Sequence, residues 1–121
     1  NIKLIINVTN SISEYYPDEF EYLKCELYDN NHDSISNYLV NSYIKIKSFQ
    51  KNNPNSNILV HCFAGASRSA SVILYYLILE NRKKDPSYNI DNALDFLKEK
   101  RIVVNPTYKF VEEIKLITNI K

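Results

Sequence analysis

The sequence of 121 residues contains one glycine, no methionine and no tryptophan. It has only two cysteines, too few for a small secreted domain held together by disulfides. Fifteen lysines and arginines are balanced by 14 aspartates and glutamates, so we expect no surface for nucleic acid or for an anionic membrane. The longest apolar run, residues 72–79, is too short to cross a bilayer, and nothing resembles a signal peptide. These absences favour one soluble domain from a reducing compartment, the cytoplasm or the nucleus.

Short apolar segments alternate along the chain with segments of helical periodicity. Residues 3–8 and 58–60 are typical of buried parallel strands, the second of a central strand covered on both faces, and residues 20–27 alternate between apolar and polar. Asp33 or Ser34 is expected to cap the first helix. The apolar spacing predicts helices over residues 35–50, 69–84, 90–101 and from 107 to beyond 117. This order predicts an α/β domain with a central, mainly parallel sheet flanked by helices.

The only glycine, Gly65, lies in the loop between a predicted strand and a predicted helix, in the segment HCFAGASRS of residues 61–69. Inward-pointing backbone N–H groups of such a loop form a cradle for an anion, and the positive end of the helix dipole reinforces it. A tight loop needs a residue tolerant of unusual dihedral angles, which Gly65 provides. Arg68 adds a planar fork of donors suited to two phosphate oxygens. The same field should lower the pKa of the Cys62 thiol, so that a thiolate lies beneath the bound phosphate, ready to form a phosphocysteine.

This segment matches the signature H-C-x-A-G-x-S-R-S position for position and resembles the dual-specificity branch of the cysteine-dependent protein tyrosine phosphatases. The resemblance implies the protein tyrosine phosphatase fold, with one catalytic domain over residues 1–121. Family members usually have a further strand and helix before the position of Asn1, so we expect a chain trimmed of both. The stretch from Arg101 to Phe110 also resembles the family, although Thr107 stands where asparagine is usual.

The resemblance assigns a role to each residue of the signature segment. Cys62 is the expected nucleophile, and Ser69 is expected to donate a hydrogen bond to the departing thiolate. His61 is expected to lie behind the nucleophile and to fix the loop. Arg68 binds the phosphate through its side chain, and the backbone amides of the loop contribute the other donors. The expected phosphate-binding residues are Phe63, Ala64, Gly65, Ala66, Ser67 and Arg68.

The resemblance also implies an aspartic acid, on a separate loop upstream, that protonates the leaving oxygen. Asp29 follows the predicted strand over residues 20–27 and lies six positions before Ile35, as the family pattern requires. Asp33 is the competing candidate, but a role as helix cap suits it better. We therefore expect Asp29 to be the general acid, a role worth about 10²–10⁴ in rate.

The implied substrates are phosphorylated proteins, and the implied binding pocket is shallow enough to accept phosphotyrosine, phosphoserine and phosphothreonine. No metal or cofactor is implied, and we expect a monomer. The alternative function is a non-catalytic module that binds phosphoproteins, as in relatives that lost the nucleophile. Cys25 is expected to be a buried strand residue; the alternative is a second thiol that protects oxidised Cys62 by forming a disulfide with it.

Overall fold

The computed structural model describes residues 2–9, 19–26, 34–62 and 67–119, and within them three strands form one parallel sheet. The strands are β1 (Ile2–Asn7), β2 (Glu21–Lys24) and β3 (Asn57–His61), in the order β2-β1-β3. Alternate side chains of the first segment, those of Leu4, Ile6 and Val8, are fully buried. The β-branched run predicted this strand because such residues pack well on a pleated, buried surface.

The middle strand of the described sheet is β1, which differs from the prediction that residues 58–60 form a central strand. In the parallel register Asn7 lies between Lys24 of β2 and His61 of β3. Leu59 of β3 is 40% exposed, so this strand is covered on one face only within the described part of the chain. The prediction was wrong on this point because an apolar triplet such as residues 58–60 occurs in edge strands as well as in central ones.

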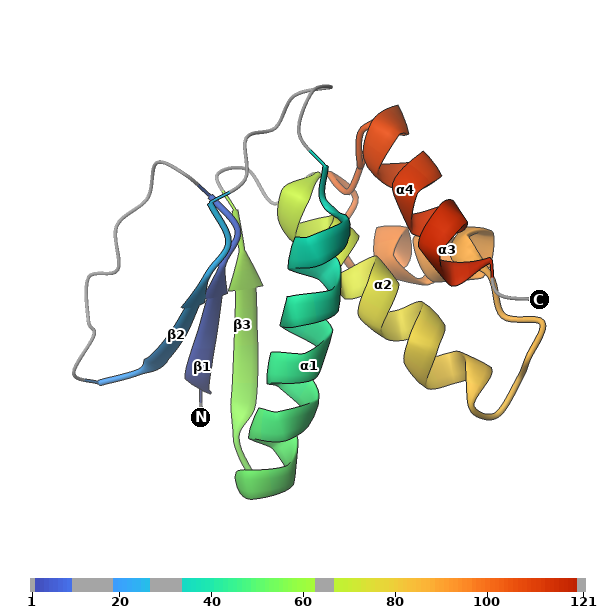
Figure 1. Cartoon of the computed structure of the whole chain (residues 1–121). Coiled ribbons are helices and arrows are strands. Elements are labelled where there is room, and N and C mark those ends of the chain that lie inside the picture. The colour runs from blue at the N-terminus through green and yellow to red at the C-terminus, as the bar shows by residue number, and fades with distance from the viewer. Residues whose placement is uncertain (1, 10–18, 27–33, 63–66, 120–121) are drawn as a thin grey trace.

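The described residues also form four helices, one between β2 and β3 and three after β3, and they lie to one side of the sheet in Figure 1. They are α1 (Ser36–Asn52), α2 (Arg68–Arg82), α3 (Ile90–Lys100) and α4 (Tyr108–Thr118). The α2 helix packs against β3 and against each of the other three helices. Most side chains in its first half are buried. The residue that opens this helix, Arg68, is itself buried.

Side-chain caps define the starts of the last two helices. The Asn89 side chain accepts a hydrogen bond from the backbone N–H of Asn92, and the Asn92 side chain accepts one from the backbone N–H of Asn89, which completes a capping box on α3. Thr107 caps α4 by accepting a hydrogen bond from the N–H of Phe110. The predicted cap of α1 is wrong for Ser34, because Ile35 is the N-cap residue and has no side-chain cap. Asp33 lies outside the described residues.

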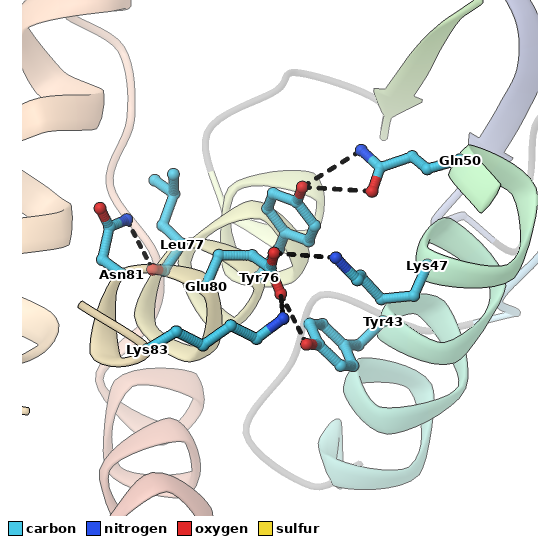
Figure 2. A network of polar contacts seen from close by, with 8 residues as sticks. All are labelled: Tyr43, Lys47, Gln50, Tyr76, Leu77, Glu80, Asn81 and Lys83. Carbon is cyan, nitrogen blue, oxygen red and sulfur yellow. Dashed lines mark hydrogen bonds and ion pairs between the residues drawn. The ribbon is translucent and has the colours of Figure 1, made fainter. Parts of the chain in front are cut away.

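Polar contacts connect α1 to α2 along one side of their interface (Figure 2). Glu80 of α2 accepts hydrogen bonds from the hydroxyl of Tyr43, at 2.6 Å, and from the ammonium of Lys47, at 2.9 Å. One turn earlier on α2, the hydroxyl of Tyr76 accepts a hydrogen bond from the side-chain amide of Gln50 at 3.1 Å. Charged and aromatic groups thus fix how these two helices pack.

Beneath these contacts lies one apolar core that includes residues of every strand and helix or their immediate flanks. Phe110 and Ile114 of α4 and Leu74 and Ile78 of α2 are completely buried in it. Among the described residues, none of the helices is both long enough and apolar enough to pass through a lipid bilayer.

Candidate active site

The signature segment connects the carboxyl end of β3 to the amino end of α2 (Figure 1). His61 is the last residue of β3, and Cys62 follows it directly. Ser67 is the N-cap residue of α2, which begins at Arg68 and continues with Ser69. The predicted phosphate-binding residues 63–66 and the general-acid candidates Asp29 and Asp33 lie outside the described residues.

The structure brings two of the predicted catalytic residues into direct contact. The Sγ atom of Cys62 lies 3.2 Å from the Oγ atom of Ser69. Both residues are buried, with 8% of Cys62 and 4% of Ser69 exposed. A hydroxyl at this distance can donate a hydrogen bond to a thiolate, and a hydrogen bond to a charged partner is stronger than one between neutral groups. The contact therefore places a hydroxyl group of α2 within hydrogen-bond distance of the Cys62 sulfur.

Arg68 is also buried, being 9% exposed, and it lies next to Ser69 in the first turn of α2. Burial keeps water from competing for the guanidinium donors, which strengthens their interaction with an anion. The turn itself presents the positive end of the helix dipole. Arg68 and the dipole thus contribute positive potential at the amino end of α2.

Ser67 is fixed by contacts that join the start of α2 to the start of α4. Its hydroxyl accepts a hydrogen bond from the backbone N–H of Thr107 at 3.0 Å. Its carbonyl oxygen accepts two more from Ser71, from the backbone N–H at 2.9 Å and from the hydroxyl at 2.8 Å. The sequence showed that Thr107 departs from the family pattern, but 40 positions separate it from Ser67 and nothing in the local pattern indicated their contact.

Hydrogen bonds join the carboxyl ends of the three strands at the edge of the sheet where Cys62 lies. The N–H of Val8 donates to the carbonyl of His61, and the N–H of Cys25 donates to the carbonyl of Asn7, both at 2.8 Å. The hydroxyl of Thr9 donates to the side chain of Asn7 at 2.9 Å. The chain that follows β2 and the chain that follows β3 therefore leave the sheet at the same edge.

Cys25, the second thiol, lies just beyond β2 and is 1% exposed, which confirms the expectation of a buried residue. Burial raises the pKa of the Cys25 thiol, and a contact of 3.5 Å with the hydroxyl of Ser42 opposes that rise only in part. Neither cysteine is in a disulfide. The two thiols thus differ in surroundings: Cys62 lies beside the first turn of α2, and Cys25 lies against the middle of α1.

A cavity of about 220 Å³ reaches Cys62 from the side of β3. His61, Cys62, Ser69 and Arg101 line it together with residues that have apolar side chains. Within residues 2–9, 19–26, 34–62 and 67–119, no group of three or more histidine, cysteine, aspartate or glutamate residues is placed to hold a metal ion.

Residues 1–120 match the family described as dual specificity phosphatase, catalytic domain. The chain belongs to the dual specificity phosphatase family. The human protein phosphatase Slingshot homolog 2 is 33% identical over 114 residues, which make up 94% of this chain and 8% of that protein. Mouse dual specificity protein phosphatase 2 is 33% identical over 113 residues, 93% of this chain and 33% of that protein. This dual specificity phosphatase domain thus spans a third or less of these two relatives.

The crystal structure of DUSP15 superposes on this dual specificity phosphatase domain with a TM-score of 0.85 at 23% sequence identity. The superposition covers 97% of this chain and 70% of that one. It confirms the fold that the signature segment implied, an α/β domain of the protein tyrosine phosphatase type.

Proposed function

We propose that this domain hydrolyses phosphate monoesters on proteins, at phosphotyrosine and at phosphoserine or phosphothreonine, through a phosphocysteine intermediate. The observation that carries the proposal is the buried Cys62 thiol, 3.2 Å from the Ser69 hydroxyl at the amino end of α2. Membership of the dual specificity phosphatase family supports the same reaction and the same class of substrate.

In the first step, the Cys62 thiolate attacks phosphorus in line with the leaving oxygen of the substrate. The S–P bond forms as the P–O bond breaks, and Asp29 gives its proton to the leaving oxygen. Arg68 and the backbone N–H groups of the loop stabilise the charge on the other three phosphate oxygens. The reaction therefore needs positive potential around the three phosphate oxygens that do not leave, and a proton donor beside the leaving oxygen, on the side of phosphorus opposite to Cys62.

In the second step, water attacks the phosphocysteine. The Asp29 carboxylate takes a proton from that water, the S–P bond breaks, and inorganic phosphate leaves as the Cys62 thiolate forms again. Ser69 stabilises this thiolate by donating a hydrogen bond across the 3.2 Å contact. The contact thus assists the step in which sulfur is the leaving group.

The sheet topology supports Asp29 as the general acid. Lys24 and His61 lie on either side of Asn7 in the parallel register, so the segments after β2 and β3 begin beside each other. Asp29 is five residues beyond Lys24, and Cys62 is one residue beyond His61. Ligands and catalytic groups of α/β domains commonly gather at this carboxyl edge of the sheet.

The expected substrate is a phosphorylated protein rather than a phosphoinositide. Related phosphatases that act on phosphoinositides have lysines inside the signature loop, and residues 62–68 contain none. The roles of Phe63, Ala64, Gly65 and Ala66 are part of the same proposal, since their backbone amides form the cradle.

The test measures release of 4-nitrophenol from 4-nitrophenyl phosphate by the wild-type domain, Cys62→Ser and Cys25→Ser. We expect Cys62→Ser to abolish turnover and Cys25→Ser to retain it. Rapid acid quench of the wild-type reaction should trap one phosphoryl group on the peptide that contains Cys62. If the wild-type domain binds a phosphopeptide but never turns it over, the protein is a non-catalytic binding module and the proposal is wrong.

A further inference from the structure

Glu113, in the second turn of α4, is surrounded by hydrogen-bond donors from a distant part of the chain. One carboxylate oxygen accepts hydrogen bonds from the Ser34 hydroxyl at 2.7 Å, the Ile35 backbone N–H at 3.0 Å and the Ser36 hydroxyl at 2.9 Å. The other oxygen accepts one from the Lys109 ammonium at 3.0 Å. The Glu113 side chain is only 16% exposed. The Glu113 carboxylate thus forms hydrogen bonds with three consecutive residues at the start of α1.

This arrangement keeps Glu113 ionised. Burial alone would raise the pKa of the Glu113 carboxyl, but the hydrogen bonds from Ser34, Lys109, Ser36 and Ile35 outweigh it and lower the pKa to about 2. A negative charge beside the amino end of α1 is also favoured by the helix dipole. The N-cap residue Ile35 offers no side-chain cap of its own, so Glu113 supplies the polar partner that this helix start lacks.

The same helix contacts the signature segment at its amino end. The backbone N–H of Thr107, the N-cap residue of α4, donates to the Ser67 hydroxyl at 3.0 Å. Six residues separate Thr107 from Glu113, a rise of about 9 Å along a helix. Phe110 lies between them with its side chain completely buried, which fixes the helix against the core. The first two turns of α4 therefore connect the start of α2 to the start of α1.

We propose that Glu113 is a positioning residue for the proton-transfer step. It fixes Ser34, Ile35 and Ser36, which follow the segment containing Asp29, at a set distance from the signature segment. This inference rests on the proposed function, in which Asp29 protonates an oxygen that is bound to phosphorus above Cys62. Proton transfer requires the two heavy atoms to come within about 2.6–3.2 Å, so loss of the anchor reduces acid catalysis.

The test compares two phosphate esters that differ in their need for an acid. Phenyl phosphate has a poor leaving group and needs protonation, whereas 2,4-dinitrophenyl phosphate has a good one. For Glu113→Ala we expect kcat/KM to fall about 10- to 100-fold on phenyl phosphate, a share of the full effect of a general acid, and less than about threefold on the dinitrophenyl ester. Glu113→Gln keeps an acceptor oxygen for the start of α1 and should recover part of the loss.

Glu112→Ala is the matched control because Glu112 precedes Glu113 on the same helix but is exposed. Its ion pair is with Lys115, at 3.5 Å on the surface. We expect wild-type values on both esters from this variant. An equal loss on both esters in Glu113→Ala would mean that Glu113 only stabilises the fold, and would overturn the proposal.

Asp29→Asn separates the positioning role of Glu113 from the function on which it rests. If Asp29→Asn selectively impairs hydrolysis of phenyl phosphate and Glu113→Ala does not, the positioning role is wrong and the proposed function stands. If Asp29→Asn affects both esters equally, the general-acid assignment fails and the positioning role fails with it.

If Glu113→Ala does not fold, Ser36→Ala provides a second test, because it removes one of the hydrogen-bond donors to Glu113. We expect this variant to show the same selective loss on phenyl phosphate, but smaller, about two- to fivefold. Equal activity of folded Ser36→Ala and wild type on phenyl phosphate would then overturn the positioning role.

Discussion

Replacing Glu80 with glutamine should destabilise the domain through the contacts between α1 and α2 that Figure 2 shows. The Glu80 carboxylate accepts hydrogen bonds from Tyr43 at 2.6 Å and from Lys47 and Lys83 at 2.9 Å each. Burial alone would raise the pKa of the Glu80 carboxyl, but these donors outweigh it and lower the pKa from 4.5 to about 2. The substitution removes this charge while changing the side-chain volume very little.

The size of the effect follows from that pKa. A difference of 2.5 between the ordinary and the folded value corresponds to about 3 kcal/mol in the free energy of unfolding. The two lysines are 39% and 56% exposed, so solvent screens them and we expect about 1–2 kcal/mol. For a domain of this size, that loss lowers Tm by about 4–8 °C.

The pH dependence gives a sharper test than the loss at neutral pH. Because the folded pKa lies below the ordinary value, the stabilisation is complete well above pH 4.5 and declines as the pH falls towards 2. By pH 3.5 roughly two-fifths of it should be gone. The difference in free energy of unfolding between wild type and Glu80→Gln should therefore shrink between pH 6 and pH 3.5.

Urea unfolding followed by circular dichroism at several pH values measures this difference. Glu99→Gln is the matched control, because Glu99 is exposed on α3 and the substitution removes the same charge. The reasoning is refuted if Glu80→Gln is no less stable than Glu99→Gln at pH 7. It is also refuted if the gap between Glu80→Gln and wild type stays constant as the pH falls.

Two further predictions concern the active site. Ser69→Ala removes the hydroxyl 3.2 Å from Cys62 Sγ, so we expect hydrolysis of the phosphocysteine to slow about 10- to 100-fold and a burst of 4-nitrophenol to precede the steady state in stopped-flow measurements. A slower steady state without a burst would contradict this role. Arg68→Lys keeps the charge but loses the planar fork, so kcat/KM for a phosphopeptide should fall at least about 100-fold with an unchanged circular dichroism spectrum. Wild-type kinetics in that variant would remove Arg68 from the phosphate site.

Local sequence features were enough to predict most of the helices and strands. The predicted helix starts at residues 90 and 107 agree with α3 and α4 within one residue. Asn89 and Thr107 cap these starts, and a capping side chain bonds to an N–H only three residues away. The apolar periodicity of the segment after Ser69 predicted a buried helix, and α2 is buried over most of its first half. The Cys62–Ser69 contact agrees with the role that the resemblance of the signature segment to the phosphatase family implied for Ser69.

Features that depend on distant segments were not predictable from these patterns. The start of α1 was assigned to a local cap, but its polar partner Glu113 lies 78 positions from Ile35. The contact between Thr107 and Ser67 spans 40 positions. A single sequence contains no periodicity that reports such pairs, because they depend on how α4 packs against the rest of the core.

The ionisation of Cys62 is the most direct test of the account. Iodoacetamide alkylation between pH 4 and 10, with the two cysteine-containing peptides quantified separately by mass spectrometry, gives the pKa of each thiol in the folded domain. The account predicts a pKa below the ordinary value for the Cys62 thiol, beside the amino end of α2, and a pKa above the ordinary value for the buried Cys25 thiol. A Cys62 thiol that titrates near 8.5, as in an unstructured peptide, would contradict the central claim.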